Sequence, residues 1–170
     1  TNLSNDNKMS GRDIGPGMCL IDSWLREKIK KNYDEDGIIA KSGKVNRISL
    51  DKLIKNSFEE EKKINSKTIQ SFDTKYFNSS FVKDLSLEDG AATLTEFTAK
   101  IIISALKATN GHKKKIILCG GGRKNKFLVN IIKLWNKDVK LIDDYGIDGD
   151  FVESQAFAYL AVRSYLKLPI

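Results

Sequence analysis

Apolar residues recur at helical spacing through most of the chain, and the clearest stripe lies between residues 86 and 108. Its members follow one another at intervals of three and four residues, the spacing of one helix face: Leu87, Ala91, Leu94, Thr98, Ile101 and Ala105. Ser86 stands three residues before Asp89, an arrangement typical of a helix start. Asn110-Gly111 predicts the end of this helix. We therefore predict one long helix over residues 86–108.

Shorter helical patterns indicate several further helices. They cover about 18–31, 34–45, a segment that begins at Ser49, 75–85, 124–135 and 151–166. The charged residues 58–71 show no clear period, and we predict a surface loop there. The last helix is apolar nearly all round, so we expect it to be buried between other layers.

Strand patterns are few. Residues 1–4 and 8–14 flank the turn-forming cluster Asn5-Asp6-Asn7 and predict a short hairpin. The apolar run 115–119 predicts a buried strand, and residues 139–142 predict another. Strands and helices alternate in the C-terminal half, which indicates an α/β fold with the two late strands parallel. The sheet is thin for so many helices.

Length and composition indicate an ordinary globular chain. With 170 residues, of which 41% are hydrophobic, a single domain would bury roughly 70% of its unfolded surface. No run approaches the ~20 apolar residues that a membrane span needs, and the N-terminal residues lack the apolar core of a signal peptide. The chain opens on Thr1 rather than Met, which leaves open where its gene begins.

The net charge of +7 admits a nucleic acid or an anionic membrane as partner. Arginine is scarce, however, whereas Lys, Asn and Ile abound together, as in a gene rich in A and T. Acidic residues also interrupt the basic ones, and no basic stripe carries the interleaved aromatic residues of a stacking platform. We therefore expect neither nucleic-acid nor membrane binding.

Cysteine and histidine exclude several kinds of site. Cys19 and Cys119 are far apart, and His112, the single histidine, stands in a polar turn. A His-based catalytic triad or a His/Cys zinc site is therefore almost excluded. Reduced thiols fit a cytoplasmic protein. Any chemistry is left to carboxylates, backbone amides, hydroxyl groups or lysines.

The first candidate site is Asp13-Ile14-Gly15-Pro16-Gly17, at a predicted strand end and helix start. Glycines let backbone N–H groups approach an anion, and a helix N-terminus adds partial positive charge. Asp13, beside such a phosphate cradle, is suited to bind Mg²⁺ or to act as a general base. The alternative is a structural Gly-Pro-Gly turn in which Asp13 caps the helix.

The second candidate is Cys119-Gly120-Gly121-Gly122, again between a strand and a helix. No Lys-Ser/Thr follows, so this is not a Walker A loop. The glycines would let a nucleotide or sugar lie against bare backbone, or would serve only a tight turn. Asn125, in the first helical turn, is suited to bind a ligand or to cap that turn.

The third candidate is Asp148-Gly149-Asp150 with Glu153, at the start of the last helix. Acidic residues there complement the helix dipole, which is a purely structural role and fits Asp150. Glu153 lies one turn inside an apolar helix, where burial would require a partner. We therefore predict that Glu153 binds a ligand.

These motifs, taken in order, resemble those of the anhydro-N-acetylmuramic acid kinases, which belong to the sugar kinase, actin and heat-shock-chaperone ATPase superfamily. The matching segments are Asp13–Trp24, Ala40–Gly43, Tyr76–Asn78, Asp89–Thr95, Cys119–Asn125 and Gly149–Ala161. Each motif is weak alone, but six in the right order over nearly the whole chain are specific.

The resemblance implies ATP-dependent phosphorylation of the 6-oxygen of 1,6-anhydro-N-acetylmuramic acid, with water opening the anhydro bridge, in cell-wall recycling. Asp13 would be the base that activates the water, and Glu153 would hold the sugar. The nucleotide and its phosphates would lie against the glycines and the nearby amide: Gly15, Gly17, Gly120, Gly121, Gly122 and Asn125. Mg²⁺ is expected to accompany ATP, and its ligands are left open.

The resemblance also implies a fold: the C-terminal lobe of an actin-like (ribonuclease H-like) ATPase over residues 1–170, helix-rich, with residues 1–14 as the remnant of a strand pair. Full members are about twice as long, so we expect that an N-terminal lobe is missing and that this piece alone is inactive. Ile14, Met18 and Arg12 depart from the family pattern. The alternative function is a non-catalytic nucleotide-binding scaffold, and a homodimer is left open.

Overall fold

The computed structural model describes residues 2–3, 9–11, 13–65, 77 and 79–169. Its longer helices are α1 (Cys19–Ile29), α3 (Arg47–Asn65), α4 (Leu87–Ala108), α5 (Lys126–Trp135) and α6 (Val152–Tyr165), with a short α2 (Ile38–Ser42). Single turns of 3-10 helix are η1 (Glu35–Gly37), η3 (Ser79–Val82), η4 (Gly111–Lys113), η5 (Gly121–Lys124) and η6 (Ile142–Tyr145). The strands are β1 (Asn2–Leu3), β2 (Met9–Ser10), β3 (Ile116–Leu118) and β4 (Val139–Leu141).

The strands form two separate pairs within the described residues. β1 and β2 pair antiparallel, with Leu3 opposite Met9, and the predicted N-terminal hairpin is therefore confirmed. Its turn lies outside the described residues. β3 and β4 pair in parallel, with Ile117 opposite Lys140, as the alternation of strand and helix predicted. The chain is thus a helix-rich α/β protein with a small parallel sheet.

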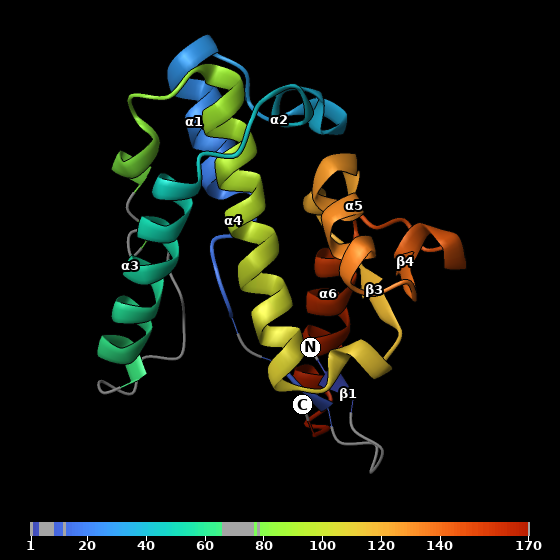
Figure 1. Ribbon diagram of the computed structural model, residues 1–170. Helices are drawn as coiled ribbons and strands as arrows, with labels where there is room; N and C mark the ends of the chain where they lie inside the picture. Colours follow the sequence, from blue (N-terminus) through green and yellow to red (C-terminus); the bar gives the residue numbers. More distant parts are fainter. Residues whose placement is uncertain (1, 4–8, 12, 66–76, 78, 170) are drawn as a thin grey trace.

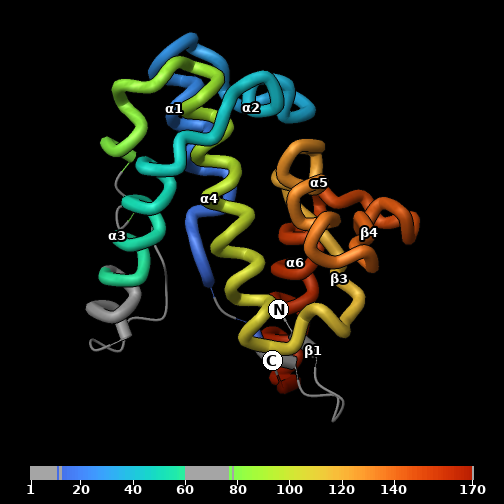
Figure 2. The backbone as a smooth tube through the Cα atoms, viewed as in Figure 1, coloured from blue at the N-terminus to red at the C-terminus, as the bar shows by residue number. Residues whose placement is uncertain are grey.

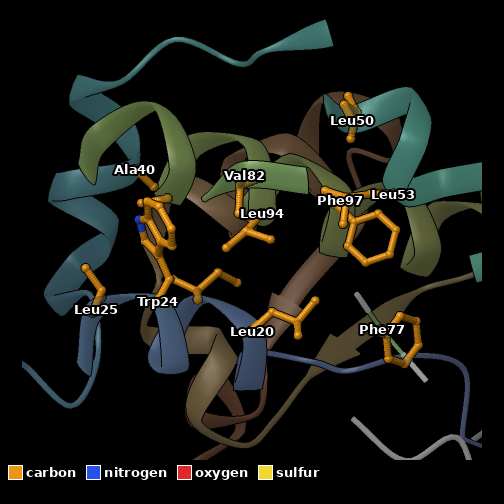
Figure 3. Close-up of a cluster of buried hydrophobic side chains, with 12 residues drawn as sticks. Leu20, Trp24, Leu25, Ala40, Leu50, Leu53, Phe77, Val82, Leu94 and Phe97 are labelled. Carbon is orange, nitrogen blue, oxygen red and sulfur yellow. The ribbon is translucent and has the colours of Figure 1, made fainter. Parts of the chain in front are cut away.

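Helix α4 runs through the middle of the molecule, with α1 and α3 on one side and α5, β3 and β4 on the other (Figures 1 and 2). Its N-terminal half belongs to one apolar cluster, shared with α1, α2 and α3 (Figure 3). Its C-terminal half belongs to a second cluster, shared with β3, β4 and α5. Met18, just before α1, packs against both clusters. The two clusters are therefore held together by α4 and Met18.

Two helix predictions need correction. The charged residues 58–65 continue α3 to Asn65 and do not form a loop; Glu and Lys are good helix formers, so no apolar stripe is required there. The remainder of that segment, 66–71, lies outside the described residues. Of the helix predicted over residues 75–85, residues 79–82 form only the short turn η3, and residues 75, 76 and 78 lie outside the described residues. Ser79 and Ser80 disfavour a longer helix, because their hydroxyls compete for backbone groups.

The prediction that the last helix is buried is wrong for this chain. No residue of α6 is buried, because no described layer covers its outer side. Strand β3, which was predicted to be buried, is likewise covered on one face only, since Ile116 is buried and Ile117 is 46% exposed. Of the described helices, none is long and apolar enough to cross a membrane.

The N-terminal cap of α4 allows a direct test of the predicted helix start. The Ser86 hydroxyl accepts a hydrogen bond from the backbone N–H of Asp89 at 3.1 Å. Replacing Ser86 by alanine is expected to lower the free energy of unfolding by about 1 kcal/mol, measured by urea denaturation. Ser104→Ala, at an exposed position inside the same helix, is the control and should cause no loss. Equal effects of both variants would contradict the capping role.

Candidate active site

The loop of the first candidate site is anchored on α4. Asp13 is exposed and follows β2 closely. Gly17 adopts a positive φ of 56°, and its carbonyl accepts a hydrogen bond of 3.0 Å from the buried Thr98 hydroxyl. An added Cβ on Gly15 would come within 2.8 Å of the Ile101 side chain. The loop therefore has a fixed position at the start of α1.

The second loop has an open side. Gly120 has a φ of 75°, which favours glycine, and an added Cβ at Gly120 or Gly121 would meet nothing within 4 Å. Both residues are exposed. Only Gly122 is packed, with its added Cβ at 3.3 Å from Cγ of Met18. If these glycines served only a tight turn, each would be closely packed. Gly122 is packed in this way, but Gly120 and Gly121 are not.

The three candidate segments lie next to one another. Met18, at the end of the first loop, contacts Gly122 of the second. The backbone N–H of Gly120 donates to the carbonyl of Gly149, in the third segment, at 3.2 Å. The first and second loops, about a hundred residues apart in sequence, and the third segment, about thirty residues further on, therefore form one continuous region. The open backbone of Gly120 and Gly121 lies in this region.

Arg123 fastens the second loop to the third. Its guanidinium is 95% buried and donates to both carboxylate oxygens of Asp143, at 2.7 and 2.9 Å, and to Asp150 at 2.7 Å. It also donates to the Gly120 carbonyl at 3.1 Å. An added Cβ on Gly149 would lie 2.2 Å from Nε of Arg123, so only glycine fits at that position. We call this group the Arg123 clamp.

The clamp sets the ionisation of its acids. Hydrogen bonds from Arg123 lower the pKa of Asp143 to about 2. Hydrogen bonds from Lys124 and then from Arg123 lower the pKa of Asp150. The hydrogen bonds with Asp143 and Asp150 raise the pKa of Arg123 in turn. The group therefore stays charged at neutral pH, and the dipole role expected for Asp150 is accompanied by direct ion pairs.

A stability measurement at several pH values tests the clamp. A lowered carboxylate pKa stabilises the folded state above the ordinary pKa of about 3.9, and this stabilisation is lost as pH falls through about 2. Arg123→Gln is therefore expected to lower the urea midpoint at pH 5 to 7, and the difference from the parent should shrink towards pH 2. Lys133→Gln, on exposed α5 surface, is the control. A difference that does not change with pH would contradict the clamp.

Asn125 acts as the N-cap of α5. It is 2% exposed, and its Oδ1 accepts a hydrogen bond from the Leu128 N–H at 2.9 Å. Its Nδ2 is buried with no hydrogen-bond partner among the described residues. Of the two roles left open for Asn125, the geometry favours the cap. Contact with a nucleotide stays a prediction.

Glu153 lies in the first turn of α6 and is exposed. The argument that burial would force a partner on Glu153 is therefore wrong for this chain, because α6 is uncovered. Glu153 follows Asp150 of the clamp by three residues. The role of Glu153 in binding sugar stays a prediction.

Several side chains of α1 and α4 make contacts that serve the fold. Trp24 is buried and donates to the Leu87 carbonyl at 2.9 Å. Asp89 accepts from the Lys44 N–H at 2.7 Å, and Thr93 accepts from the Asn46 N–H at 3.0 Å. Asp22 differs, because its Oδ1 is buried without a partner among the described residues and burial raises its pKa. The hydrogen bonds of Trp24, Asp89 and Thr93 fix α1 and the segment between α2 and α3 on α4.

None of the sequence patterns described above predicted the Arg123 clamp. The available signal was a lone arginine directly after three glycines, followed about twenty residues later by four aspartates in an eight-residue loop, Asp143, Asp144, Asp148 and Asp150.

Within the described residues, no three His, Cys, Asp or Glu side chains gather closely enough to hold a metal ion. Mg²⁺ in phosphoryl-transfer sites is usually held by one or two carboxylates together with the phosphates of the substrate. A cluster of three such residues is therefore not required for Mg²⁺, and we assign no metal ligand among the described residues.

Comparison with known proteins identifies the class and then the family. The anhydro-N-acetylmuramic acid kinase of Pelagibacter ubique is 46% identical to this chain, and the match covers 96% of the chain and 44% of that relative. The anhydro-N-acetylmuramic acid kinase of Zymomonas mobilis is 36% identical, and the match covers 98% of the chain and 45% of that relative. These relatives are sugar kinases. The family model for anhydro-N-acetylmuramic acid kinase matches residues 1–170, so the chain belongs to this family. It spans less than half the length of these relatives.

Proposed function

We propose that this chain is the C-terminal lobe of a kinase that transfers phosphate from ATP to 1,6-anhydro-N-acetylmuramic acid. The observation that carries the proposal is the meeting of three separate segments, around Gly17, Gly121 and Gly149, at one open stretch of glycine backbone. Phosphoryl transfer depends on positioning and electrostatics rather than on a nucleophilic side chain. A site without histidine and without a reactive cysteine pair suits that chemistry.

In the proposed site, the nucleotide lies against Gly120 and Gly121. A Cβ added to either residue would meet nothing within 4 Å, so a flat or charged ligand can approach the backbone closely. Gly15 and Gly17 face its phosphates from the start of α1, where the helix dipole favours negative charge. Met18 and Gly122 hold the two loops in register.

Asp13 acts in this proposal as the general base. Asp13 accepts a proton from water, and the water oxygen bonds to the anomeric carbon of the sugar. The bond from that carbon to the 6-oxygen breaks, and the freed 6-oxygen takes the γ-phosphoryl group of ATP. The products are N-acetylmuramic acid 6-phosphate and ADP. Glu153 holds the sugar, and Mg²⁺ bound with ATP offsets the charge of the phosphates.

The proposal extends to the whole protein. The lobe has an actin-like fold, is completed by an N-terminal lobe of the same polypeptide, and works in the cytoplasm in cell-wall recycling. The small β3–β4 sheet and the helices around α4 support such an incomplete α/β lobe. A homodimer of the whole kinase is compatible with this arrangement.

A chimera tests the proposed function. In this chimera, the chain replaces the matching residues of the Pelagibacter ubique kinase. We expect ATP-dependent phosphorylation of the anhydro sugar by the chimera and no turnover by the 170-residue chain alone, both followed by mass spectrometry of the sugar product. Turnover by the 170-residue chain alone would contradict the proposal that this lobe provides only part of the active site.

The second candidate is a nucleotide-binding scaffold without catalysis, favoured by Met18, which stands where the family pattern often has a polar residue. Met18 packs into both apolar clusters and so serves the fold. A chimera that binds ATP but phosphorylates no anhydro sugar would favour this candidate over the kinase.

A further inference from the structure

Arg123 stands directly after three glycines, where an arginine would ordinarily be expected to bind a phosphate group. Its contacts leave little room for that role. A guanidinium has five N–H donors, and four of them already have partners in the chain: Nε and Nη2 each donate to Asp143, and Nη1 donates to Asp150 and Gly120. Nη2 also lies 3.8 Å from Asp148. With its side chain 5% exposed, Arg123 is directed into the chain rather than towards a ligand.

Gly120 is held through both of its backbone groups. Its N–H donates to the Gly149 carbonyl at 3.2 Å, and its carbonyl accepts from the Arg123 N–H at 3.2 Å and from Nη1 of Arg123 at 3.1 Å. The peptide between Gly120 and Gly121 is trans, which places its C=O and its N–H on opposite sides. The bonds to the Gly120 carbonyl therefore also set the direction of the Gly121 N–H, away from Arg123.

These hydrogen bonds matter because packing does not fix the loop. Glycine has the fewest backbone restrictions of any residue, and three in succession give the loop many alternative conformations. An added Cβ at Gly120 or Gly121 would meet nothing within 4 Å, and side-chain packing reaches only Gly122. The conformation of the open stretch therefore depends on its hydrogen bonds, and Arg123 makes two of the three described for Gly120.

Asp143 and Asp150 hold the guanidinium in this place. Asp143 accepts from it at 2.7 and 2.9 Å and Asp150 at 2.7 Å, and both acids lie exposed between β4 and α6. An acid beside a bound nucleotide would by itself weaken binding, because like charges repel. Their place next to the glycine loop is therefore explained by Arg123 and not by the ligand.

We propose that Arg123 is a positioning residue for the nucleotide. Held by Asp143 and Asp150, it sets the backbone of Gly120 and Gly121 in the conformation that the nucleotide contacts, without touching the nucleotide itself. This inference rests on the proposed function, which assigns the glycine loop to ATP. It differs from a purely structural role, which would affect stability alone, and from direct phosphate binding by Arg123.

Asp143→Asn in the chimera distinguishes these roles by the sign of its effect. Asparagine has a similar shape, but it has one acceptor oxygen in place of two and no charge. If Arg123 positions the loop, Kd for a non-hydrolysable ATP analogue should rise at least about tenfold, because small displacements of supporting groups have effects of this size. If Arg123 bound phosphate directly, loss of a neighbouring negative charge would leave Kd unchanged or lower it. Titration calorimetry without sugar measures Kd.

Asp144→Asn is the matched control. Asp144 is the neighbouring exposed acid, and its carboxylate accepts from the Leu141 N–H at 3.0 Å rather than from Arg123. This variant removes the same charge outside the clamp and should not raise Kd. Asp150→Asn removes the other acid that holds Arg123 and should raise Kd as well. It decides the question if Asp143→Asn does not fold, which the melting temperature shows.

Several outcomes would overturn the proposal. An unchanged Kd with a lower melting temperature would make the clamp purely structural, and a lower Kd would identify Arg123 as a phosphate ligand. An equal rise in Asp144→Asn would indicate a general effect of the acidic loop. A parent chimera that does not bind the analogue would refute the proposed nucleotide site and this inference with it. A parent that binds, with Asp143→Asn and Asp150→Asn binding equally well, would refute this inference alone.

Discussion

Replacing Asp13 by asparagine is expected to lower kcat of the chimera by about 10²- to 10⁴-fold, the usual contribution of a positioned general base. Asparagine has nearly the same shape, but it cannot accept the proton of the attacking water. Asp13 is exposed beside a loop that Thr98 and Ile101 hold in place, so the substitution should change neither the fold nor KM for ATP. Initial rates of phosphorylated sugar formation measure the effect.

Asp51→Asn, at an exposed position on α3, is the control for Asp13→Asn. It should leave kcat and the melting temperature unchanged. Undiminished turnover by the Asp13→Asn chimera would remove Asp13 as the base. Asp13 would then belong only to the Gly-Pro-Gly turn, and the capping alternative is wrong in any case, because Met18 is the N-cap of α1 and no described side chain caps that helix.

Replacing Gly121 by valine is expected to raise KM for ATP by at least about tenfold, equivalent to about 1.4 kcal/mol of lost binding. Gly121 has no positive φ, and an added Cβ would meet nothing within 4 Å. The chain therefore has room for the side chain, and the melting temperature should hardly change. In the proposed site, the valine side chain would occupy space that the nucleotide needs.

Gly121→Ala should give a smaller rise in KM, and the two variants form a series with side-chain size. Ala108→Val adds similar bulk at the exposed end of α4 and should leave KM unchanged. A Gly121→Val chimera that binds ATP as well as its parent would mean that the glycines serve only the turn between β3 and α5.

Much of the fold could be predicted from local pattern. The stripe of α4, its Ser86 cap and the parallel pair β3–β4 follow from residue spacing, and the structure confirms them. The extension of α3 could not be read from periodicity, because residues 58–65 are mostly charged and form no apolar stripe in the sequence. Burial of α6 was wrongly predicted because an apolar composition indicates that a helix needs a cover but not which polypeptide provides it.

The candidate site was predictable in part. Glycines between strand and helix mark both loops, but their proximity depends on Met18 and Gly122, whose contact spans about a hundred residues. The Arg123 clamp depends on loop geometry that no local pattern encodes. Asn125 shows the limit of motif reasoning, since the same amide suits a ligand and a cap, and only the Leu128 hydrogen bond separates these roles.

The central claim is that the loops at Gly15–Gly17 and Gly120–Gly122 bind one nucleotide together. Hydrogen exchange of the chimera, with and without a non-hydrolysable ATP analogue, tests it most directly. We predict slower exchange in both loops at the same analogue concentration, with α3 unchanged as the control. Protection of only one loop, or of neither while the analogue is bound, would contradict a shared nucleotide site.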